Sequence, residues 1–334
     1  MIEIINIEEA LKLENVIFID TRTPKEFEQD CLPNAINLPI LTNEERAIVG
    51  TLYKQVSKEK AIEQGMEYFS PKLPDFLSEI KKHQDKNIIV YCWRGGMRSK
   101  TVVALFEALG YRIKQMKGGY KSYRKYVIDQ IAEFKLKPKL VVLSGLTCTG
   151  KTDLLKLLPH SLDLEGLAQH RNSLYGAIGL IPNSQKKFEN LMLQKLNELN
   201  KEKYIFIEGE SRRIGDVEIP PFLWKAMRND IHVLIKRKIE NRAKACAEEY
   251  FSTEENVKKI KEITLSLWKV IGRKRKLEAA EYINQGNYQE AAKILLEEYY
   301  DPLYGNTLKQ FNYELKVDSD DVKKAVKLLS DRFQ

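Results

Sequence analysis

Short apolar runs alternate with helical stretches in the first third of the chain. VIFID at 16–20 and NIIVYC at 87–92 are continuous apolar runs of the length expected for buried strands. SKTVVALFEALG at 99–110 has apolar residues at helical spacing and closes at Gly110, a favourable residue for the end of a helix. RIKQM follows at 112–116. Strand, helix and strand in this order predict a parallel α/β sheet.

The same alternation begins again near the middle of the chain. A charged helical stretch at 122–139 ends at Pro138, and KLVVLSG at 139–145 opens a second series of short apolar runs. From about Glu240 the pattern is mostly helical. Further strands are predicted at 161–166, 204–211 and 230–236. The predicted organisation is a parallel-sheet domain at 1–126, a connecting helix or linker at 127–138, a second α/β domain at 139–239 and a helical C-terminal region at 240–334.

Composition and cysteine spacing indicate the cellular compartment in which the protein is expected. The 334 residues are 43% hydrophobic and 31% charged, enough for two ordinary folded domains. Four cysteines lie far apart, at Cys31, Cys92, Cys148 and Cys246, and fit neither a disulfide framework nor metal-ligand spacing. The N-terminal stretch lacks the pattern of a signal peptide, and no apolar run approaches the roughly 20 residues of a membrane span. We therefore expect a cytoplasmic protein without a membrane partner.

The stretch YCWRGGMRSK at 91–100 surrounds a thiol with groups that favour anions. Cys92 follows a predicted strand, and a helix is predicted to begin at Ser99. Glycines let backbone N–H groups converge, and Arg94 and Arg98 add full positive charges. Such surroundings lower a thiol pKa and stabilise a negatively charged adduct on sulfur, such as a persulfide or its selenium counterpart. A buried strand-end cysteine beside an ordinary turn is the alternative. The predicted anion loop comprises Trp93, Arg94, Gly95, Gly96, Met97, Arg98 and Ser99.

A second loop, GLTCTGKT at 145–152, fits the phosphate-binding pattern G-x-x-x-x-G-K-[ST]. It lies between a predicted strand and a helical pattern, which is the context that this motif requires. Backbone N–H groups wrap the phosphates, Lys151 neutralises them, and Thr152 is a candidate Mg²⁺ ligand. The predicted phosphate-binding residues are Gly145, Thr147, Cys148, Thr149, Gly150, Lys151 and Thr152.

Acidic and basic residues follow the next two predicted strands. The acids are candidates for the metal side of a phosphate site, and helix capping or solvation is the alternative for each pair. For His170, a structural hydrogen bond and a catalytic role are both open. Arg212 and Arg213 are predicted to hold a phosphate or an RNA backbone. The predicted polar site consists of Asp163, Glu165, His170, Arg171, Glu208, Glu210, Ser211, Arg212 and Arg213.

The thiol loop resembles the active-site loop of the rhodanese family, sulfurtransferases that carry sulfur as a cysteine persulfide. D-T-R at 20–22 with the following P-K-E-F, AINLP at 35–39, and Gly118-Gly119-Tyr120 match other stretches of that family. The resemblance implies that Cys92 is the carrier nucleophile. It also implies that Arg22 and Glu26 form a pair that holds the fold.

The two loops together resemble the tRNA 2-selenouridine synthase family. YCWRGGMRS, LDLEGLA-x-HR-x-S-x-x-G, SQKKFEN and ESRRIG occur in this order. GTLYKQ at 50–55, SPKLP at 70–74 and YYDPLY at 299–304 add to the likeness, which covers nearly the whole chain. The expected architecture is therefore a rhodanese-like domain followed by a P-loop NTPase-like α/β domain with a helical C-terminal extension.

The resemblance implies chemistry at the wobble uridine of tRNA. Geranyl diphosphate first alkylates the 2-thio group, and selenium from selenophosphate then replaces the S-geranyl group. The implied partners are the anticodon region of thiolated tRNAs and an enzyme that produces selenophosphate.

The segment at 258–276 has eight basic residues and one acidic residue, within a chain of net charge +8. Such a run is usually a solvated helix face, but with a tRNA substrate implied we expect it to contact phosphates. The predicted tRNA contacts are Arg273, Lys274, Arg275 and Lys276.

Two alternatives remain open in the sequence. Family members usually read T-G-x-G-K-T in the phosphate loop, so Cys148 stands in place of a glycine. If that position has φ above zero, a cysteine there is strained, and it is either an inert replacement or a second reactive thiol. The alternative function is a P-loop ATPase or kinase with a rhodanese-like redox or sulfur-carrier module, which ATP turnover without RNA would favour.

Overall fold

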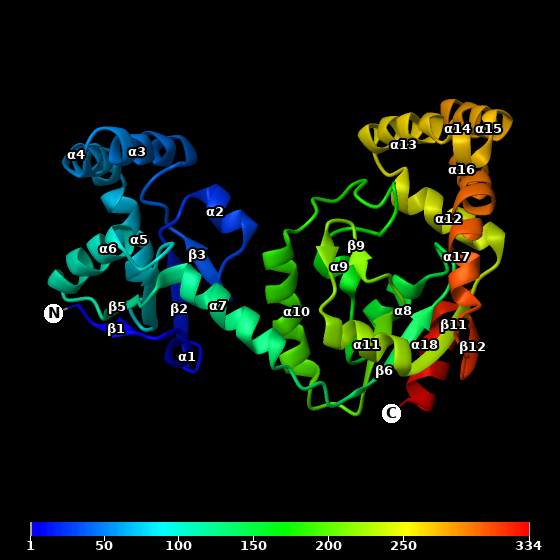
Figure 1. The fold of residues 1–334 in the computed structure, drawn as a ribbon, viewed down its shortest axis with the longest axis horizontal. Helices are drawn as coiled ribbons and strands as arrows, with labels where there is room; N and C mark the ends of the chain where they lie inside the picture. Colours follow the sequence, from blue (N-terminus) through cyan, green and yellow to red (C-terminus); the bar gives the residue numbers. More distant parts are fainter. Residues whose placement is uncertain (1, 334) are drawn as a thin grey trace. The chain divides into compact units, whose positions relative to one another are not determined.

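The computed structural model describes residues 2–333, apart from the side chains of Trp268 and Lys269. The chain divides into two compact units, Met1–Glu133 and Phe134–Gln334, each an α/β domain on a parallel sheet (Figure 1). The division falls within the stretch predicted to connect the domains. None of the described helices combines the length and apolar character needed to cross a membrane.

The first domain has a five-stranded parallel sheet in the order β1-β5-β4-β2-β3. Its strands are β1 (Ile4–Ile5), β2 (Val16–Asp20), β3 (Ala35–Asn37), β4 (Asn87–Tyr91) and β5 (Ile113–Met116). The central strand β4 is buried from Ile88 to Tyr91 because both faces of the sheet are covered. That double burial explains why its sequence is continuously apolar.

Helices of the first domain place the thiol loop between β4 and α6. They are α1 (Ile7–Ala10), α2 (Pro24–Gln29), α3 (Asn43–Gln55), α4 (Lys58–Phe69), a 3-10 turn η1 (Ser70–Lys72), α5 (Leu73–Lys82), α6 (Met97–Ala108) and α7 (Gly119–Ala132). Helix α6 begins two residues before the predicted Ser99. Helix α7 begins at Gly119 and buries Tyr123 and Val127. The first half of the predicted connecting segment at 127–138 is therefore part of α7 in the first domain.

The second domain has a parallel sheet in the order β12-β11-β6-β8-β7. Its strands are β6 (Lys139–Ser144), β7 (Ser161–Leu162), β8 (Tyr204–Glu208), β11 (Ile231–Lys236) and β12 (Leu315–Asp318), beside an antiparallel hairpin of β9 (Arg213–Ile214) and β10 (Val217–Glu218). The strand predicted at 161–166 is wrong beyond Leu162. Asp163 caps a short helix there, because its carboxylate accepts the backbone N–H of Gly166.

Helices pack around the second sheet and extend to one side of it. They are α8 (Lys151–Leu157), α9 (Leu164–Ala168), α10 (Gln185–Leu199), α11 (Pro221–Asn229), α12 (Ile239–Tyr250), α13 (Glu254–Ser266), α14 (Trp268–Ile271), α15 (Arg273–Asn284), α16 (Tyr288–Leu295), a π-helical turn η2 (Leu296–Tyr300), α17 (Asp301–Leu308) and α18 (Val322–Arg332). Figure 1 shows α12 to α17, in yellow and orange, gathered to one side of the sheet. The C-terminal region is mostly helical as predicted, but β12 returns to pair with β11.

Candidate functional site

Cys92 lies at the carboxyl end of β4, where its thiol meets the start of α6. The residue is 3% exposed. The backbone N–H of Gly96, the N-cap residue of α6, donates a hydrogen bond to Sγ at 3.2 Å, and the Ser99 hydroxyl donates another at 3.3 Å. The side-chain amide of Gln115 donates to the Ser99 hydroxyl at 2.9 Å and orients it. Two donors and a helix N-terminus favour an anionic group at this sulfur.

The glycine turn before α7 supports the backbone of the thiol loop. Gly119 has φ of +59°, and a Cβ added there would lie 2.3 Å from the Cys92 carbonyl oxygen and 2.5 Å from the Gly95 nitrogen. Only glycine permits this approach. The N–H of Tyr120 then donates to the Cys92 carbonyl at 2.8 Å. The turn that the sequence shares with rhodaneses therefore fixes the loop that carries the thiol.

The two arginines of the loop have different surroundings. Arg94 is exposed, as is Met97, and Arg94 makes no ion pair with another described residue. Arg98 is largely buried, with its guanidinium 2.9 Å from the Glu26 carboxylate. Burial alone would raise the pKa of Glu26, but the hydrogen bond and charge of Arg98 hold that pKa below its usual value. Arg94 is thus the arginine available to an incoming anion.

The predicted pairing of Arg22 with Glu26 is wrong. The buried Arg22 guanidinium instead binds the Asp20 carboxylate at 2.6 Å. Asp20 is the last residue of β2, two positions before Arg22 in the chain. The same guanidinium lies 4.0 Å over the ring of Tyr120, which stacks on Trp93 at 5.3 Å. The Trp93 ring is therefore held in place by its stacking on Tyr120, which in turn packs against the buried Arg22–Asp20 pair.

The phosphate loop follows β6 and ends at α8, in the context that its motif requires. Gly150 has φ of +82° and is the N-cap residue of α8. The Lys151 amine donates to the Gly145 carbonyl at 3.1 Å. A Cβ on Gly145 would lie 2.7 Å from the carbonyl oxygen of Ile235, so glycine is required there. The predicted residues that line the cavity at this loop are Gly145, Thr147, Cys148, Thr149, Gly150, Lys151 and Thr152.

Cys148 has φ of +60°, the condition under which we expect strain in a residue that carries a Cβ. Its side chain packs against the apolar cluster that contains Cys246 and Tyr250. The hydrogen bond with Cys148, together with burial, holds the pKa of the Cys246 thiol well above its ordinary value. Cys148 also lines the cavity at the phosphate loop, so an inert replacement and a second reactive thiol both stay open as predictions.

Three residues far away in the sequence hold the backbone of the phosphate loop, and sequence analysis missed all of them. Arg242, buried on α12, donates to the Thr147 carbonyl at 2.9 Å and pairs with Asp301 at 2.5 Å. The Ser319 hydroxyl donates to the Thr149 carbonyl at 2.6 Å. Asp301 belongs to the stretch YYDPLY, whose likeness to the family was the available signal.

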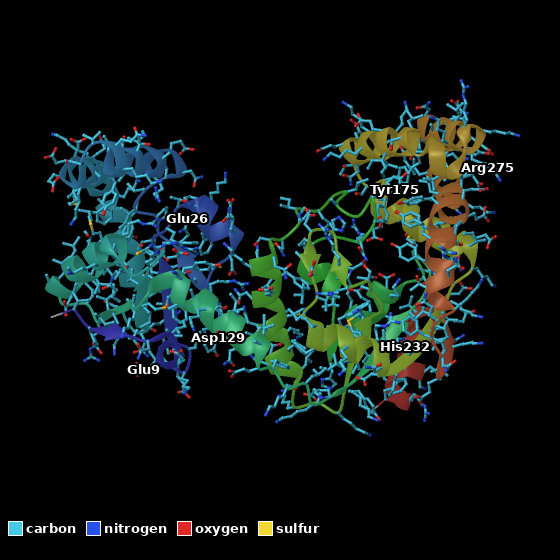
Figure 2. The ribbon with its side chains drawn as sticks, in the orientation of Figure 1. Glu9, Glu26, Asp129, Tyr175, His232 and Arg275 are labelled. Atoms are coloured by element: carbon cyan, nitrogen blue, oxygen red, sulfur yellow. The ribbon has the colours of Figure 1, made fainter. Side chains whose placement is uncertain are left out.

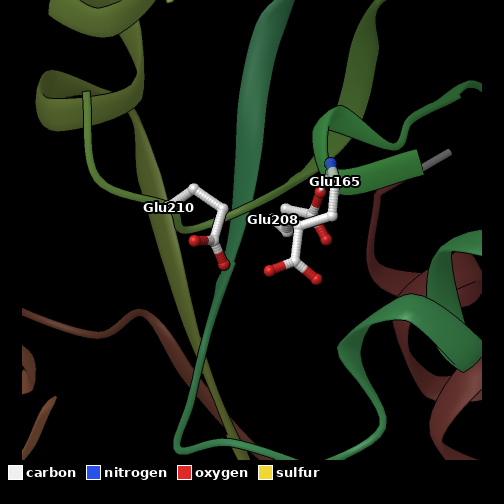
Figure 3. Close-up of side chains that lie close together, drawn as sticks. All are labelled: Glu165, Glu208 and Glu210. Atoms are coloured by element: carbon white, nitrogen blue, oxygen red, sulfur yellow. Dashed lines mark hydrogen bonds between the residues drawn. The ribbon is translucent and has the colours of Figure 1, made fainter. Parts of the chain in front are cut away.

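Glu165, Glu208 and Glu210 converge beside the phosphate loop (Figure 3). One oxygen from each carboxylate lies within 4.8 Å of the others. The Glu165 N–H donates to Glu208 Oε1 at 2.6 Å, whereas Glu208 Oε2 is buried and has no hydrogen-bond partner among the described residues. Burial raises the pKa of all three, and neighbouring carboxylates raise it further. A buried oxygen without a partner and three carboxylates fit a divalent cation.

Two residues of the predicted polar site have structural roles. Asp163 accepts a hydrogen bond from the Gly166 N–H at 2.7 Å and caps α9. Glu165, by contrast, belongs to the group of three glutamates. The His170 ring accepts the Asn172 N–H at 3.0 Å, and burial lowers its pKa. His170 thus makes the structural hydrogen bond that was one of its two alternatives.

The basic residues of the polar site differ in their availability. Arg171 lines the cavity at the phosphate loop and pairs with Glu249 at 2.6 Å. Arg212 and Arg213 begin the β9–β10 hairpin, where both side chains are more than half exposed and pair with acids of the same hairpin. The Ser211 hydroxyl donates to the Arg213 carbonyl at 2.5 Å and accepts from the Asn172 side-chain amide at 2.8 Å. The predicted phosphate or RNA role of the hairpin arginines stays a prediction.

The predicted tRNA contacts lie together in the first turn of α15. They are Arg273, Lys274, Arg275 and Lys276. The first three are exposed, and Figure 2 shows Arg275 on the helical side of the domain, away from His232 in the sheet. Arg275 pairs with Glu278 at 3.0 Å and with Glu298 at 3.1 Å. The grouping makes a compact basic surface.

We expect Mg²⁺ to raise the thermal unfolding midpoint of the second domain by about 2–4 °C, because it would offset the repulsion among the three glutamates. Glu208→Gln replaces one candidate ligand carboxylate at nearly constant shape and should abolish most of this gain. Scanning calorimetry with and without MgCl₂ measures the effect. Glu198→Gln, at an exposed position of α10, is the matched control. An equal gain in both variants would place the ion elsewhere.

Comparison with known proteins decides the family. A family model described as the tRNA 2-selenouridine synthase AAA domain matches residues 138–270, and a rhodanese-like domain model matches residues 6–126. The tRNA 2-selenouridine synthase of Hydrogenovibrio crunogenus is 31% identical over 94% of this chain and 96% of its own. The chain belongs to the tRNA 2-selenouridine synthase family.

Other members of the family match over a shorter region. The tRNA 2-selenouridine synthase of Nitrosomonas europaea is 38% identical over 73% of this chain, and the match spans 66% of that protein. Among solved structures, the N-terminal domain of a Clostridium difficile 630 protein named for ATP/GTP binding is 46% identical, with a TM-score of 0.37. That match covers 38% of this chain and 99% of the other. The segments matched by the two family models include both loops of the candidate site.

Proposed function

We propose that the protein converts the wobble 2-thiouridine of tRNA to 2-selenouridine through an S-geranyl intermediate. The observation that carries the proposal is the presence, in one chain of this family, of a buried thiol at a helix N-terminus and a phosphate loop faced by three glutamates. The first can hold an anionic selenium donor and the second can hold a diphosphate. The protein is accordingly a transferase that acts on tRNA.

In the first step, the phosphate loop binds geranyl diphosphate. The sulfur of 2-thiouridine attacks C1 of the geranyl group, the C1–O bond breaks, diphosphate leaves, and the N3 proton of the base is released to solvent. Lys151 and the loop N–H groups stabilise the negative charge that develops on the leaving group. Mg²⁺, when held by Glu165, Glu208, Glu210 and Thr152, supplies further charge neutralisation for the diphosphate.

In the second step, selenophosphate binds at the thiol loop of the first domain. Its selenium bonds to C2 of the uracil ring, the C2–S bond breaks, and geranyl thiolate leaves; water then cleaves the Se–P bond and releases phosphate. The Cys92 thiol orients the selenium without forming a bond to it, while the Gly96 N–H and Arg94 hold the anionic donor. S-alkylation makes sulfur a better leaving group than a free thiocarbonyl, which explains the order of the two steps.

Nucleoside mass spectrometry of thiolated tRNA tests the proposal. With geranyl diphosphate alone, S-geranyl-2-thiouridine should accumulate; with selenophosphate added, 2-selenouridine should replace it. Tight ATP binding and ATP turnover without RNA, with no response to geranyl diphosphate, would favour a P-loop ATPase or kinase with a rhodanese-like module instead.

The basic turn of α15 is proposed to contact tRNA phosphates. We expect the double variant Arg273→Gln/Lys274→Gln to weaken tRNA binding and to lower the slope of log affinity against log salt by about 2. Fluorescence anisotropy across a salt series measures both. Lys323→Gln/Lys324→Gln, which removes the same charge from the first turn of α18, is the matched control. Unchanged binding by the α15 variant would exclude this surface.

A further inference from the structure

A second cavity, of about 280 Å³, adjoins the phosphate loop and has mainly apolar and aromatic walls. Val142 comes from β6, His232 from β11, Trp224 and Met227 from α11, and Leu308 from the end of α17. These walls come from four elements that are distant in sequence. The volume is close to the lower end of the roughly 300–1,000 Å³ range of small-molecule sites.

This cavity shares part of its lining with the cavity at the phosphate loop. Gly145, Gly209, Glu210 and Tyr304 line both. Gly145 opens the phosphate loop, and Glu210 is one of the three converging glutamates. A molecule with its phosphates at the loop can therefore extend past Gly145 into the apolar cavity.

Polarity changes along the cavity in one direction. Val142 and Ser144 are two residues apart on β6, so their side chains lie on the same face of the sheet. Ser144 is nearer the carboxyl end of the strand, where the phosphate loop begins, and Val142 is farther from it. Along β6 the cavity wall is thus polar next to the loop and apolar away from it. This gradient suits a ligand with an anionic head and a hydrocarbon tail.

Aromatic rings form the part of the cavity away from the loop. His232 stacks on Phe311 with ring centroids 4.1 Å apart, and both of its ring nitrogens are inaccessible to solvent. Burial lowers the pKa of His232, so its ring is neutral at physiological pH. The Arg228 guanidinium lies over the rings of Phe311 and Trp224, at 5.3 and 5.8 Å from their centroids. Polar side chains also line the cavity, among them Arg228 and Thr307, but most of the exposed wall is aromatic ring and aliphatic surface that suits a hydrocarbon chain.

We infer that this cavity is the subsite for the hydrocarbon chain of a prenyl diphosphate whose phosphates bind at the phosphate loop. The inference rests on the proposed function and extends it. The same domain would select its substrate by the hydrocarbon chain of the prenyl group as well as by the charge of the diphosphate. The affinity of a prenyl diphosphate for the protein should increase with each carbon that the cavity removes from water, up to the length at which the hydrocarbon chain reaches the aromatic wall.

Calorimetric titration with a series of ligands tests this subsite. The series consists of inorganic pyrophosphate, the C5, C10 and C15 prenyl diphosphates, and ATP, all with Mg²⁺. We expect the C10 diphosphate to bind wild type at least about tenfold tighter than pyrophosphate. Leu308→Trp fills the cavity from a half-buried position of α17 and should remove this advantage, with pyrophosphate affinity unchanged. Leu303→Trp, on the same helix but 53% exposed and outside the cavity lining, is the matched control.

The outcomes separate the subsite from the proposed function. Equal affinity of wild type for pyrophosphate and the C10 diphosphate would overturn the subsite but leave the phosphate site in place. Failure of the phosphate site itself would appear as the absence of pyrophosphate binding. ATP that binds tighter than pyrophosphate and is weakened by Leu308→Trp would assign the cavity to a nucleobase and overturn the inference. Retained pyrophosphate affinity in Leu308→Trp shows that the variant is folded.

Discussion

Cys92→Ala should stop selenium incorporation into tRNA while geranylation continues within about twofold of the wild-type rate. The thiol loop and the phosphate loop belong to different compact units, and each has its own anion-binding groups. Removal of the sulfur leaves the Gly96 N–H and the Ser99 hydroxyl without the atom that they bind. Because the donor loses the thiol that positions its selenium, we expect the selenium step to fall by at least about 10²-fold.

Nucleoside mass spectrometry of the same reaction mixture measures both steps. S-geranyl-2-thiouridine should accumulate in Cys92→Ala and persist after selenophosphate is added. Cys31→Ala removes a cysteine of the same domain that lies outside the thiol loop, and it should behave as wild type. Loss of both steps in Cys92→Ala, with the first domain still folded by circular dichroism, would show that the thiol loop serves the whole reaction.

Lys151→Ala should give the reciprocal result. We expect geranylation to fall by about 10²–10³-fold, because the variant loses the one positive side chain that the phosphate motif supplies to the leaving diphosphate. The Lys151 amine also donates to the Gly145 carbonyl, so the loop loses an internal hydrogen bond as well. Selenium incorporation from unmodified thiolated tRNA should therefore fail in this variant.

A tRNA that already carries S-geranyl-2-thiouridine bypasses the first step and provides the control. Lys151→Ala should convert this tRNA to the selenouridine form at close to the wild-type rate with selenophosphate. Slow conversion of the pre-geranylated tRNA would mean that the phosphate loop also takes part in the selenium step. Unimpaired geranylation by Lys151→Ala would remove geranyl diphosphate from the phosphate loop.

The parts of the site that lie within one strand–loop–helix unit could be predicted from the sequence. Cys92 and Lys151 each follow a continuously apolar strand, and the residues that shape their loops are neighbours in the chain. Local patterns of this kind contain both the element boundaries and the chemistry. Even the strain at Cys148 followed from one departure from a family pattern.

The choice between neighbouring carboxylates could not be predicted in the same way. The choice of Asp20 over Glu26 as the partner of Arg22 depends on which carboxylate the folded sheet brings opposite the guanidinium. Asp163 and Glu165 are two residues apart and equally acidic, yet one caps α9 and the other joins the glutamate cluster. The sequence spacing does not show which of the two acids caps a helix and which joins the cluster. Only the path of the folded backbone decides between these roles.

The apolar cavity beside the phosphate loop was also outside the reach of sequence patterns. Val142, Trp224, His232 and Leu308 belong to separate elements, and each has an ordinary role in its own strand or helix. A cavity arises where such elements fail to fill the space between them, and that property belongs to the tertiary packing.

The bond between Ser319 and the phosphate loop has a consequence for how the protein is made. It joins positions 170 residues apart, and β12 just before it pairs with β11. While the ribosome is still adding residues before 319, the first domain already has all its strands, but the phosphate loop lacks a hydroxyl that will hold the Thr149 carbonyl. We therefore expect the first domain to fold during translation, whereas the second exposes one edge of its sheet, at β11, to chaperones or to other chains until β12 has been made.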